Sequence, residues 1–292
     1  MNSFAIYTAI VGNYDNILQP KVVDPRFDYI LFSNDIKEEN IGVWQIRPID
    51  YYNKDQIKIA RWVKTHPEEL LQGYDFSIWM DANIQIETDY IYKCSIDFFN
   101  KKISISSIVH PERTCIYQEM FAVFFLNYES IKTILRWSNV LKRNHFPRNV
   151  GLNETGVLFR NHLSPKVMEI DRLWWSFINE YSRRDQLSFN YVLWKLQLRS
   201  EPLLPANQSV YNSKHFNYIF HVNDKAKYCA NKAEFSWMQH YCALFPKEQA
   251  NIKTIFFNII GKRCPFLRVF FYEFKCRIII YWRRFFNRIK GL

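Results

Sequence analysis

Short apolar runs alternate with polar turns and amphipathic segments along most of the chain. The runs at residues 4–11, 29–32, 43–49 and 76–80 are rich in β-branched and aromatic side chains and end in polar clusters, which is typical of buried strands. Residues 55–72 instead carry apolar side chains at helical spacing, interrupted by a proline that predicts a restart of the helix. Because strands and helices alternate, the pattern predicts an α/β sheet.

The second half of the chain predicts more helices than strands. We expect a helix at residues 128–142, a strand at 156–160 and a strongly amphipathic helix at about 184–198. Prolines and polar residues between 202 and 214 predict an irregular connection.

Acidic side chains follow three of the predicted strands. Asp15, Asp35 and Asp81 each lie within a few residues of the carboxyl end of a strand. Open α/β sheets bind ligands beyond the carboxyl ends of their strands, so we expect these acids to converge on one edge of the sheet.

The most abrupt of these strand ends is Asp81-Ala82-Asn83. A carboxylate directly after a buried strand, with a second oxygen ligand two residues later, suits a Mg²⁺ or Mn²⁺ ion that also binds phosphate oxygens. Asn83 supplies a neutral amide at the second position, which weakens the case for an ion. On their own, the three residues are more typical of a strand that ends in a turn.

The composition is that of a globular protein. Of 292 residues, 48% are apolar and 18% aromatic, enough for a substantial core. The net charge of +11 is concentrated in residues 251–292, where ten Lys and Arg stand against one acid and give +9. The main body therefore lacks the basic field of a nucleic-acid-binding protein. We place a boundary near residue 235, between a domain at 1–235 and a basic tail at 236–292.

The cysteines and the amino terminus indicate a reducing compartment. Six cysteines are scattered without a paired spacing, which predicts free thiols. The first residues lack the basic start, long apolar stretch and small-residue cleavage site of a secretory signal. We therefore expect a cytoplasmic protein.

Residues 251–292 hold eleven aromatic side chains among their ten cations. Their apolar stretches are much shorter than the roughly 20 residues that cross a bilayer. Cations interleaved with large aromatics predict a basic amphipathic helical tail, which lies in the headgroup region at the inner face of an anionic membrane. A helix pair packed on the main domain or on a second copy is the competing interpretation, and nucleic-acid binding is the least favoured.

Seven short blocks follow one another along residues 4 to about 221: YTAIVGNYD (7–15), DYILFSND (28–35), ARWVKTHPEELL (60–71), SIWMDANIQI (77–86), HPERTCIYQE (110–119), GLNETGVLFRNH (151–162) and YSRRDQLSFNYVLWK (181–195). Together they resemble a glycosyltransferase-like family long filed as domain of unknown function 616, which has plant cell-wall and bacterial surface-polysaccharide members. Residues beyond about 235 lie outside the resemblance.

The resemblance implies a GT-A type fold, in which a Rossmann-type mixed sheet flanked by helices binds a nucleotide-sugar. It places Asp81 and Asn83 at the Asp-x-Asp motif of such enzymes, and Thr8 and Asp35 where the base and ribose bind. A buried strand hydroxyl is the other interpretation of Thr8. The third motif position is often not Asp in this family, which leaves open whether a divalent cation, Mn²⁺ or Mg²⁺, takes part. His221 is our expected third ligand to such an ion.

Arg61 and Lys64 lie three residues apart on the helix before this strand and therefore share one face. If that face meets the strand ends, the planar guanidinium and the compact ammonium neutralise a diphosphate. A solvated helix face is the other interpretation.

Asp185 and Gln186 stand at the expected first turn of a helix, where free amides and the helix dipole favour a carboxylate. The pair is similar to the Asp-Gln at helix starts in family 8 retaining glycosyltransferases, where it faces donor sugar and acceptor. The similarity implies a carboxylate that deprotonates the acceptor hydroxyl or stabilises an oxocarbenium-like state, with retention of anomeric configuration. A plain helix cap is the alternative.

Other positions in and near the matched blocks are expected to form acceptor contacts or active-site wall. Trp174 suits stacking on a sugar ring, although core packing is the more common role of such a residue. A lone histidine such as His110 is more often a structural hydrogen-bonding residue than a zinc ligand. The residues assigned to this wall are His110, Arg113, Glu119, Glu154, Trp174 and Arg184.

These features predict a cytoplasmic, membrane-peripheral glycosyltransferase that moves a sugar from a nucleotide-sugar to a surface glycan, such as a capsule or lipopolysaccharide, or to its lipid-linked precursor. A catalytically inactive scaffold that binds sugar nucleotides or membranes is an alternative. Hydrolysis of a lipid amide, an activity claimed for plant relatives, is disfavoured because the sequence shows neither a His/Cys zinc set nor a serine-centred elbow.

Overall fold

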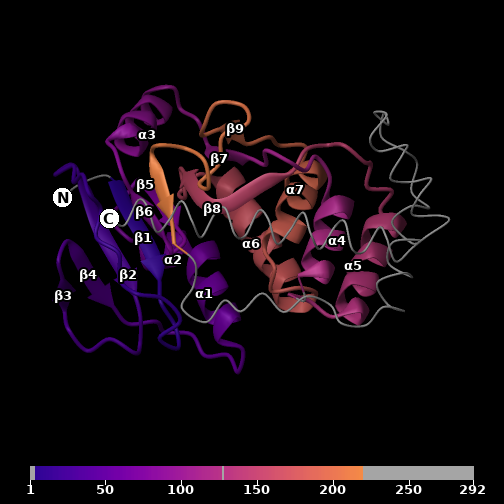
Figure 1. Cartoon of the computed structure of the whole chain (residues 1–292), viewed down its shortest axis with the longest axis horizontal. Helices are drawn as coiled ribbons and strands as arrows, with labels where there is room; N and C mark the ends of the chain where they lie inside the picture. Colours follow the sequence, from indigo (N-terminus) through magenta and orange to yellow (C-terminus); the bar gives the residue numbers. More distant parts are fainter. Residues whose placement is uncertain (1–3, 127, 220–292) are drawn as a thin grey trace. The chain divides into compact units, whose positions relative to one another are not determined.

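The structure, a computed structural model, describes residues 4–126 and 128–219 (Figure 1). All of them belong to one compact unit, Met1–Tyr228, of the two into which the chain divides. His221 and the predicted tail at 236–292 lie outside the described residues.

A mixed sheet of eight strands forms the centre of the described part. In order across the sheet, the strands are β3 (Asn40–Ile41), β4 (Trp44–Arg47), β2 (Phe27–Phe32), β1 (Phe4–Ala9), β5 (Phe76–Met80), β8 (Asn153–Arg160), β7 (Ile105–Val109) and β9 (Glu201–Pro202). β4, β2, β1 and β5 are parallel to one another, which brings their carboxyl ends to one edge of the sheet. β8 runs antiparallel to both β5 and β7.

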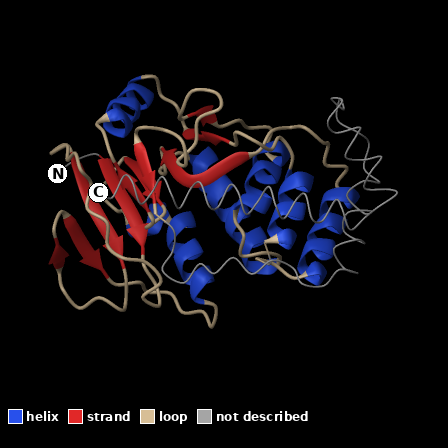
Figure 2. Cartoon of the chain, viewed as in Figure 1, coloured by secondary structure: helices blue, strands red, loops and turns tan. Residues whose placement is uncertain are grey.

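Helices cover both faces of this sheet in the described residues (Figure 2). The helices of the described part are α1 (Gln56–Thr65), α2 (Pro67–Leu70), α3 (Tyr90–Asn100), α4 (Ile116–Phe125), α5 (Ile131–Arg143), α6 (Pro165–Glu180) and α7 (Gln186–Lys195). Side chains of α3 join the apolar cluster on one face, and side chains of α1, α6 and α7 join the cluster on the other. The expected mixed α/β sheet flanked by helices is confirmed.

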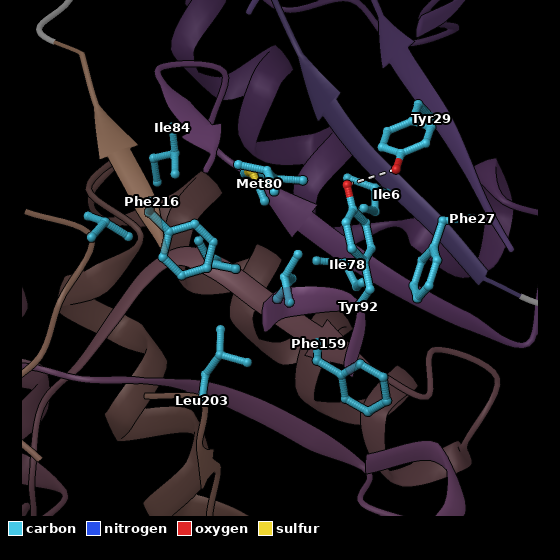
Figure 3. Close-up of a cluster of buried hydrophobic side chains, with 14 of the residues drawn as sticks. Ile6, Phe27, Tyr29, Ile78, Met80, Ile84, Tyr92, Phe159, Leu203 and Phe216 are labelled. Atoms are coloured by element: carbon cyan, nitrogen blue, oxygen red, sulfur yellow. Dashed lines mark hydrogen bonds between the residues drawn. The ribbon is translucent and has the colours of Figure 1, made fainter. Parts of the chain in front are cut away.

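The strands are buried on both faces. Along β1, Ile6 joins the cluster beside α3, whereas Ala5 and Tyr7 join the cluster beside α1 and α6. Figure 3 shows the first cluster, in which the hydroxyl of Tyr29 donates to that of Tyr92 at 2.8 Å. Burial on both faces explains why these strands are continuous apolar runs in the sequence rather than alternating ones.

A second, two-stranded sheet follows the end of β5. Its strands β6 (Ile84–Ile86) and β10 (Phe216–Tyr218) pair antiparallel. This sheet connects the turn after β5 with the last described residues.

The predicted break in the helix at 55–72 is confirmed. The side chain of Asp55 caps α1 by accepting a hydrogen bond from the Ile57 amide at 3.1 Å. After Thr65, Pro67 starts α2 at a first-turn position, where its missing amide hydrogen has no helical partner to lose.

Two expectations about the second half are corrected. The helix predicted at 184–198 is shorter and is not amphipathic, because seven consecutive residues of α7, Leu187 to Leu193, are buried. Contacts with α4, α6 and β8 enclose it, and its polar Asn190 is satisfied inside by Asn153. The strand predicted at 156–160 begins earlier, at Asn153.

Candidate active site

The carboxyl end of β5 is a sharp turn built around Asp81. Its backbone amide donates to the carbonyl of Gly156 at 2.8 Å, and its carbonyl accepts from the amide of Ile84 at 2.9 Å. Its side-chain Oδ1 accepts from the indole Nε1 of Trp79 at 2.7 Å. Strand β5 therefore ends in an acid whose Oδ1 is held by Trp79 of the same strand.

Helix α1 brings two cations to this acid. The Arg61 Nη1 and the Lys64 Nζ each lie 3.5 Å from Oδ1 of Asp81. The same two side chains meet Asp185, with Arg61 Nε 3.4 Å from Oδ1 and Lys64 Nζ 2.5 Å from Oδ2. We call Arg61, Lys64, Asp81 and Asp185 the charged quartet. The shared face of Arg61 and Lys64 thus points to the end of β5.

Exposure differs across the quartet. The side chain of Lys64 is 0% exposed and that of Asp185 7%, whereas Arg61 is 17% and Asp81 28% exposed. Arg61 and Asp81 are therefore the most accessible members of the quartet. The hydrogen bond from Trp79 and the 3.5 Å contacts with Arg61 and Lys64 are all made by Oδ1 of Asp81.

Lys64 sits between two indole rings. Its Nζ lies 5.4 Å from the ring centroid of Trp79 and 5.6 Å from that of Trp174, within the range of cation–π attraction. Trp174 is fully buried and donates its Nε1 hydrogen to the carbonyl of Asp185 at 2.9 Å. Trp174 therefore supports the quartet from inside and does not line a wall where a sugar can stack.

Asp185 occupies the N-cap position of α7, but its side chain makes no capping hydrogen bond. Its Oδ2 instead accepts from Lys64 and, at 3.0 Å, from the hydroxyl of Thr155. Burial opposes ionisation, but the charges of Arg61 and Lys64 outweigh it and hold the pKa of Asp185 well below its usual range. The carboxylate is thus ionised and held by the core of the site.

The residues predicted to bind base and ribose lie near the first strand ends. Thr8 lines a pocket together with Asp81, Trp44 and Met80, and its buried hydroxyl has no hydrogen-bond partner among the described residues. Asp35 is exposed and accepts a hydrogen bond from the amide of Gly12 at 2.5 Å, which ties the loops after β1 and β2 together. Gly12 has a φ of +72°, a conformation that favours glycine.

Of the expected metal ligands, His221 lies outside the described residues, and the side chain of Asn83 is engaged with the backbone. The amide Nδ2 of Asn83 donates to the carbonyl of Ile219 at 3.0 Å, and the backbone amide of Ile219 donates to the carbonyl of Asn83 at 2.8 Å. Asn83 thus holds the last described residues. Within the residues that the structure describes, no group of three or more His, Cys, Asp or Glu side chains is arranged to hold a metal ion.

A second polar set lies at the amino end of α4. Nδ1 of His110 accepts from the backbone amides of Glu112 and Arg113 at 3.1 and 3.0 Å, so the proton of a neutral ring resides on Nε2. Arg113 Nε lies 2.6 Å from Oε2 of the buried Glu119. His110 is therefore a structural residue of this loop as well as a candidate for the wall.

The remaining candidates lie on β8 and α7 or just before it. Glu154 is buried beside Thr155 on β8. The guanidinium of Arg184 stacks over the ring of Tyr128 at 4.2 Å. At the start of α7, the side-chain Nε2 of Gln186 is buried and has no hydrogen-bond partner in the described part of the chain.

Three residues of the site escape the sequence patterns: Trp79, Thr155 and Gly156. The β7–β8 register shifts between Ser107 and Ile108, so Thr155 and Gly156 leave the ladder with β7 while Gly156 stays bonded to Asp81. A Cβ on Gly156 would lie 2.9 Å from Cδ1 of Ile84 and 3.5 Å from Oδ2 of Asp81. A glycine inside a strand pattern is the signal that can reveal such a close approach.

A buried ion pair, Arg160 with Asp171, lies next to the backbone of Lys64. Nη1 of Arg160 lies 2.7 Å from Oδ1 of Asp171, and Nη2 donates to the carbonyl of Lys64 at 2.6 Å and to the hydroxyl of Tyr7. Burial raises the pKa of Asp171 to about 7, and Arg160 opposes this shift. This network fixes the last turn of α1 and hence the base of the Lys64 side chain.

Charged side chains beyond the carboxyl end of a strand in an α/β sheet mark the edge at which such proteins bind ligands. The family model described as TOD1/MUCI70, glycosyltransferase-like domain, matches residues 1–223, so the chain belongs to this family. The resemblance carried by the seven blocks is confirmed: residues 1–223 form a glycosyltransferase-like domain.

The other comparisons add less. An apo structure of the bifunctional glycosyltransferase WbbM is similar with a TM-score of 0.39 and 10% sequence identity, over 86% of this chain and 46% of that one. The chain therefore spans less than half the length of that protein. No curated protein matches the chain. Among the described helices, none combines the length and the apolar character needed to cross a bilayer.

Proposed function

We propose that this protein transfers a sugar from a nucleotide-sugar donor to a surface glycan or to its lipid-linked precursor. The observation that carries the proposal is the charged quartet at the carboxyl end of β5, the edge at which open α/β sheets bind ligands. The family of the chain supports the same class of reaction.

In this proposal the donor diphosphate lies beside Arg61. Its guanidinium is partly exposed, and its Nε is buried without a hydrogen-bond partner among the described residues, although Asp185 lies at ion-pair distance. A planar fork of this kind suits two phosphate oxygens. Oδ2 of Asp81 accepts from a ribose or sugar hydroxyl, and the unpaired hydroxyl of Thr8 contacts the nucleoside from the neighbouring pocket.

Asp185 acts as an ionised group in this proposal. Its pKa lies far below neutrality because Arg61 and Lys64 outweigh the effect of burial, so it accepts a proton poorly. A fixed negative charge instead stabilises the positive charge that develops at the anomeric carbon. Of the two roles that the Asp-Gln similarity implies, electrostatic stabilisation is therefore the one we propose, with retention of configuration.

The acceptor side is proposed from the wall residues and from the basic tail. His110, Arg113, Glu119, Glu154 and Arg184 supply polar groups for a glycan. The charge of +9 in residues 251–292 favours an anionic membrane surface and hence a lipid-linked acceptor at its inner, cytoplasmic face.

The test is a panel of nucleotide-sugars offered to the purified full chain, with binding and slow donor hydrolysis followed by mass spectrometry. We expect at least one nucleotide-sugar to bind and to be hydrolysed. Asp81→Ala should abolish transfer while leaving the protein folded, because a rim carboxylate contributes little to core packing. Asp97→Ala, which removes an exposed aspartate of α3, is the matched control. Retained turnover in a folded Asp81→Ala protein contradicts the proposed donor site.

A further inference from the structure

Lys64 has the place and the contacts of an internal counter-ion. Its side chain is 0% exposed, and its ammonium lies 2.5 Å from Asp185 and 3.5 Å from Asp81. A lysine so deeply buried is rare unless it is paired. Here it joins two carboxylates, one from the end of β5 and one from the start of α7, that would otherwise repel each other.

Arg61 completes the balance of charge. It also meets both carboxylates, at 3.5 and 3.4 Å, so two cations and two anions give the quartet a formal charge of zero. The Arg61 contacts are longer than that of Lys64 with Asp185, and its buried Nε makes no hydrogen bond among the described residues. Arg61 is therefore the cation that can turn to an incoming anion while Lys64 continues to hold Asp185.

A divalent ion does not fit the donor set at this position. Oδ1 of Asp81 already accepts from Trp79 and lies 3.5 Å from both cations. These two positive charges repel a metal ion from the same carboxylate. Hard cations favour several oxygen ligands at once, and the second carboxylate of the site, that of Asp185, already accepts from Lys64 and Thr155.

We propose that Lys64 and Arg61 take the place of a divalent cation, so that donor binding requires no metal ion. The inference rests on the proposed function and specifies how its donor site works. Lys64 is a positioning residue, which holds Asp185 in place and lies beside Asp81. Arg61 is the group that contacts the donor diphosphate.

The first experiment measures UDP and GDP binding to the full chain by isothermal titration calorimetry, in EDTA and in MnCl₂ or MgCl₂. We expect the Kd of the nucleotide that binds to change by less than about threefold between the buffers. Tightening by more than about tenfold with either metal overturns the inference but leaves the proposed function standing. Absence of binding by both nucleotides in every buffer overturns the inference and contradicts the proposed donor site as well.

The second experiment uses Mn²⁺ alone and follows its binding by electron paramagnetic resonance. Wild type should leave Mn²⁺ free. Lys64→Met removes the ammonium and leaves two carboxylates facing one space, so we expect this variant to bind Mn²⁺ at least about tenfold more tightly than wild type. Lys54→Met, which removes an exposed lysine just before α1, should behave as wild type.

Equal Mn²⁺ binding by wild type and Lys64→Met, with circular dichroism showing both proteins folded, overturns the role of Lys64. If Lys64→Met does not fold, Arg61→Met supplies the decision. It should weaken nucleotide binding by about tenfold or more in EDTA and in Mn²⁺ alike. A loss that Mn²⁺ restores to the wild-type Kd overturns the inference.

Discussion

Asp185 is a buried carboxylate whose charge depends on its neighbours. Its side chain is 7% exposed, and it is bound by Lys64 at 2.5 Å and by Thr155 at 3.0 Å. Burial alone favours the neutral acid, so removal of one partner from such a pair leaves a costly unpaired charge. The function of Asp185 and the stability of the site therefore depend on the same contacts.

Substitution of Asp185 by Asn distinguishes a charged role from a capping role. Asn caps helices well, so a cap would leave activity nearly unchanged. We expect Asp185→Asn to lower kcat by about 10²-fold or more with a modest change in donor affinity, because the charge at the sugar is lost. Steady-state donor hydrolysis measures both quantities. Asp55→Asn is the control, since Asp55 caps α1 through its side chain; a small kcat effect at both positions sinks the charged role.

The ion pair of Asp185 with Lys64 predicts that the stability of the protein depends on pH. The pKa of Asp185 in the folded protein lies below the ordinary value of 3.8, since Arg61 and Lys64 outweigh burial. A lowered pKa stabilises the folded protein above the unfolded pKa, and this contribution is lost as the pH falls through the folded pKa. The difference in unfolding free energy between wild type and Asp185→Asn should therefore shrink below about pH 4. Urea unfolding at neutral and acid pH measures it, and a constant difference would contradict the ion pair.

The residue types of the site can be predicted from the sequence, but their pairing cannot. Asp81, Arg61 and Asp185 stand out because strand ends and helix starts are where charged ligands bind. Lys64 and Asp185, however, are 121 positions apart, and no local pattern shows that they meet. The burial of Lys64 comes from the indole rings of Trp79 and Trp174 around it. The sequence does not show this burial, so from the sequence alone Lys64 is predicted to contact the donor directly.

At the scale of elements, the site depends on an irregular stretch of β8. Gly156 accepts from the Asp81 amide, and Thr155 donates to Asp185, so one strand positions both acids. Because Thr155 and Gly156 do not pair with β7, this stretch of β8 can bond to the residues at the end of β5 instead. Bulges of this kind often lie next to active sites, where they redirect side chains.

Gly156→Ala should impair the site through a single clash. The added Cβ would lie 2.9 Å from Cδ1 of Ile84, so the end of this buried side chain must shift, and with it the packing around Asp81. We expect a loss of about 1 kcal/mol of stability, at the low end of overpacking costs, and a fall in activity as Asp81 shifts. Thermal unfolding and donor hydrolysis measure the two effects. Ile84→Val removes the clashing methyl, so the double variant should recover part of both; an additive double variant refutes the clash.

Elements can be predicted from the sequence where burial produces a simple pattern of apolar residues. The runs at 4–11 and 76–80 correspond to β1 and β5 because strands buried on both faces are continuously apolar. The first residues of β8 are polar, so the apolar pattern does not reveal where the strand begins. Asn153 is satisfied there by hydrogen bonds with Ser107 of β7 and Asn190 of α7. The position of β8 between β5 and β7 is also a tertiary choice that no local pattern contains.

At the scale of the whole molecule, charge and family match divide the chain in the same way. The family match ends at residue 223, and residues 251–292 hold +9 of the total charge of +11. The tail is outside the described residues, so its role is a prediction from composition. A basic aromatic segment beside a sugar-transferring domain would raise the local concentration of enzyme at a lipid-linked acceptor.

The tail should bind anionic vesicles in a salt-sensitive way. Ten cations attract the surface, and the Debye length falls to about 3 Å at 1 M salt, so most of this attraction is screened there. Insertion of the eleven aromatics should leave a salt-resistant fraction. Co-sedimentation with phosphatidylglycerol vesicles at low and high salt measures both parts, and phosphatidylcholine vesicles supply the neutral reference.

Two variants, a truncated protein and a full chain with three arginines replaced, test whether residues 251–292 cause the vesicle binding. A truncated protein that ends at Phe235 should lose vesicle binding and still bind nucleotide-sugar, because the quartet lies within the matched domain. The full chain with Arg283, Arg284 and Arg288 changed to Gln should lose much of the low-salt binding, at about 1 kcal/mol per charge, and keep donor hydrolysis. Equal sedimentation of all three proteins refutes the membrane role. An insoluble truncated protein, together with unchanged binding by the Gln variant, indicates instead that the tail packs on the main domain.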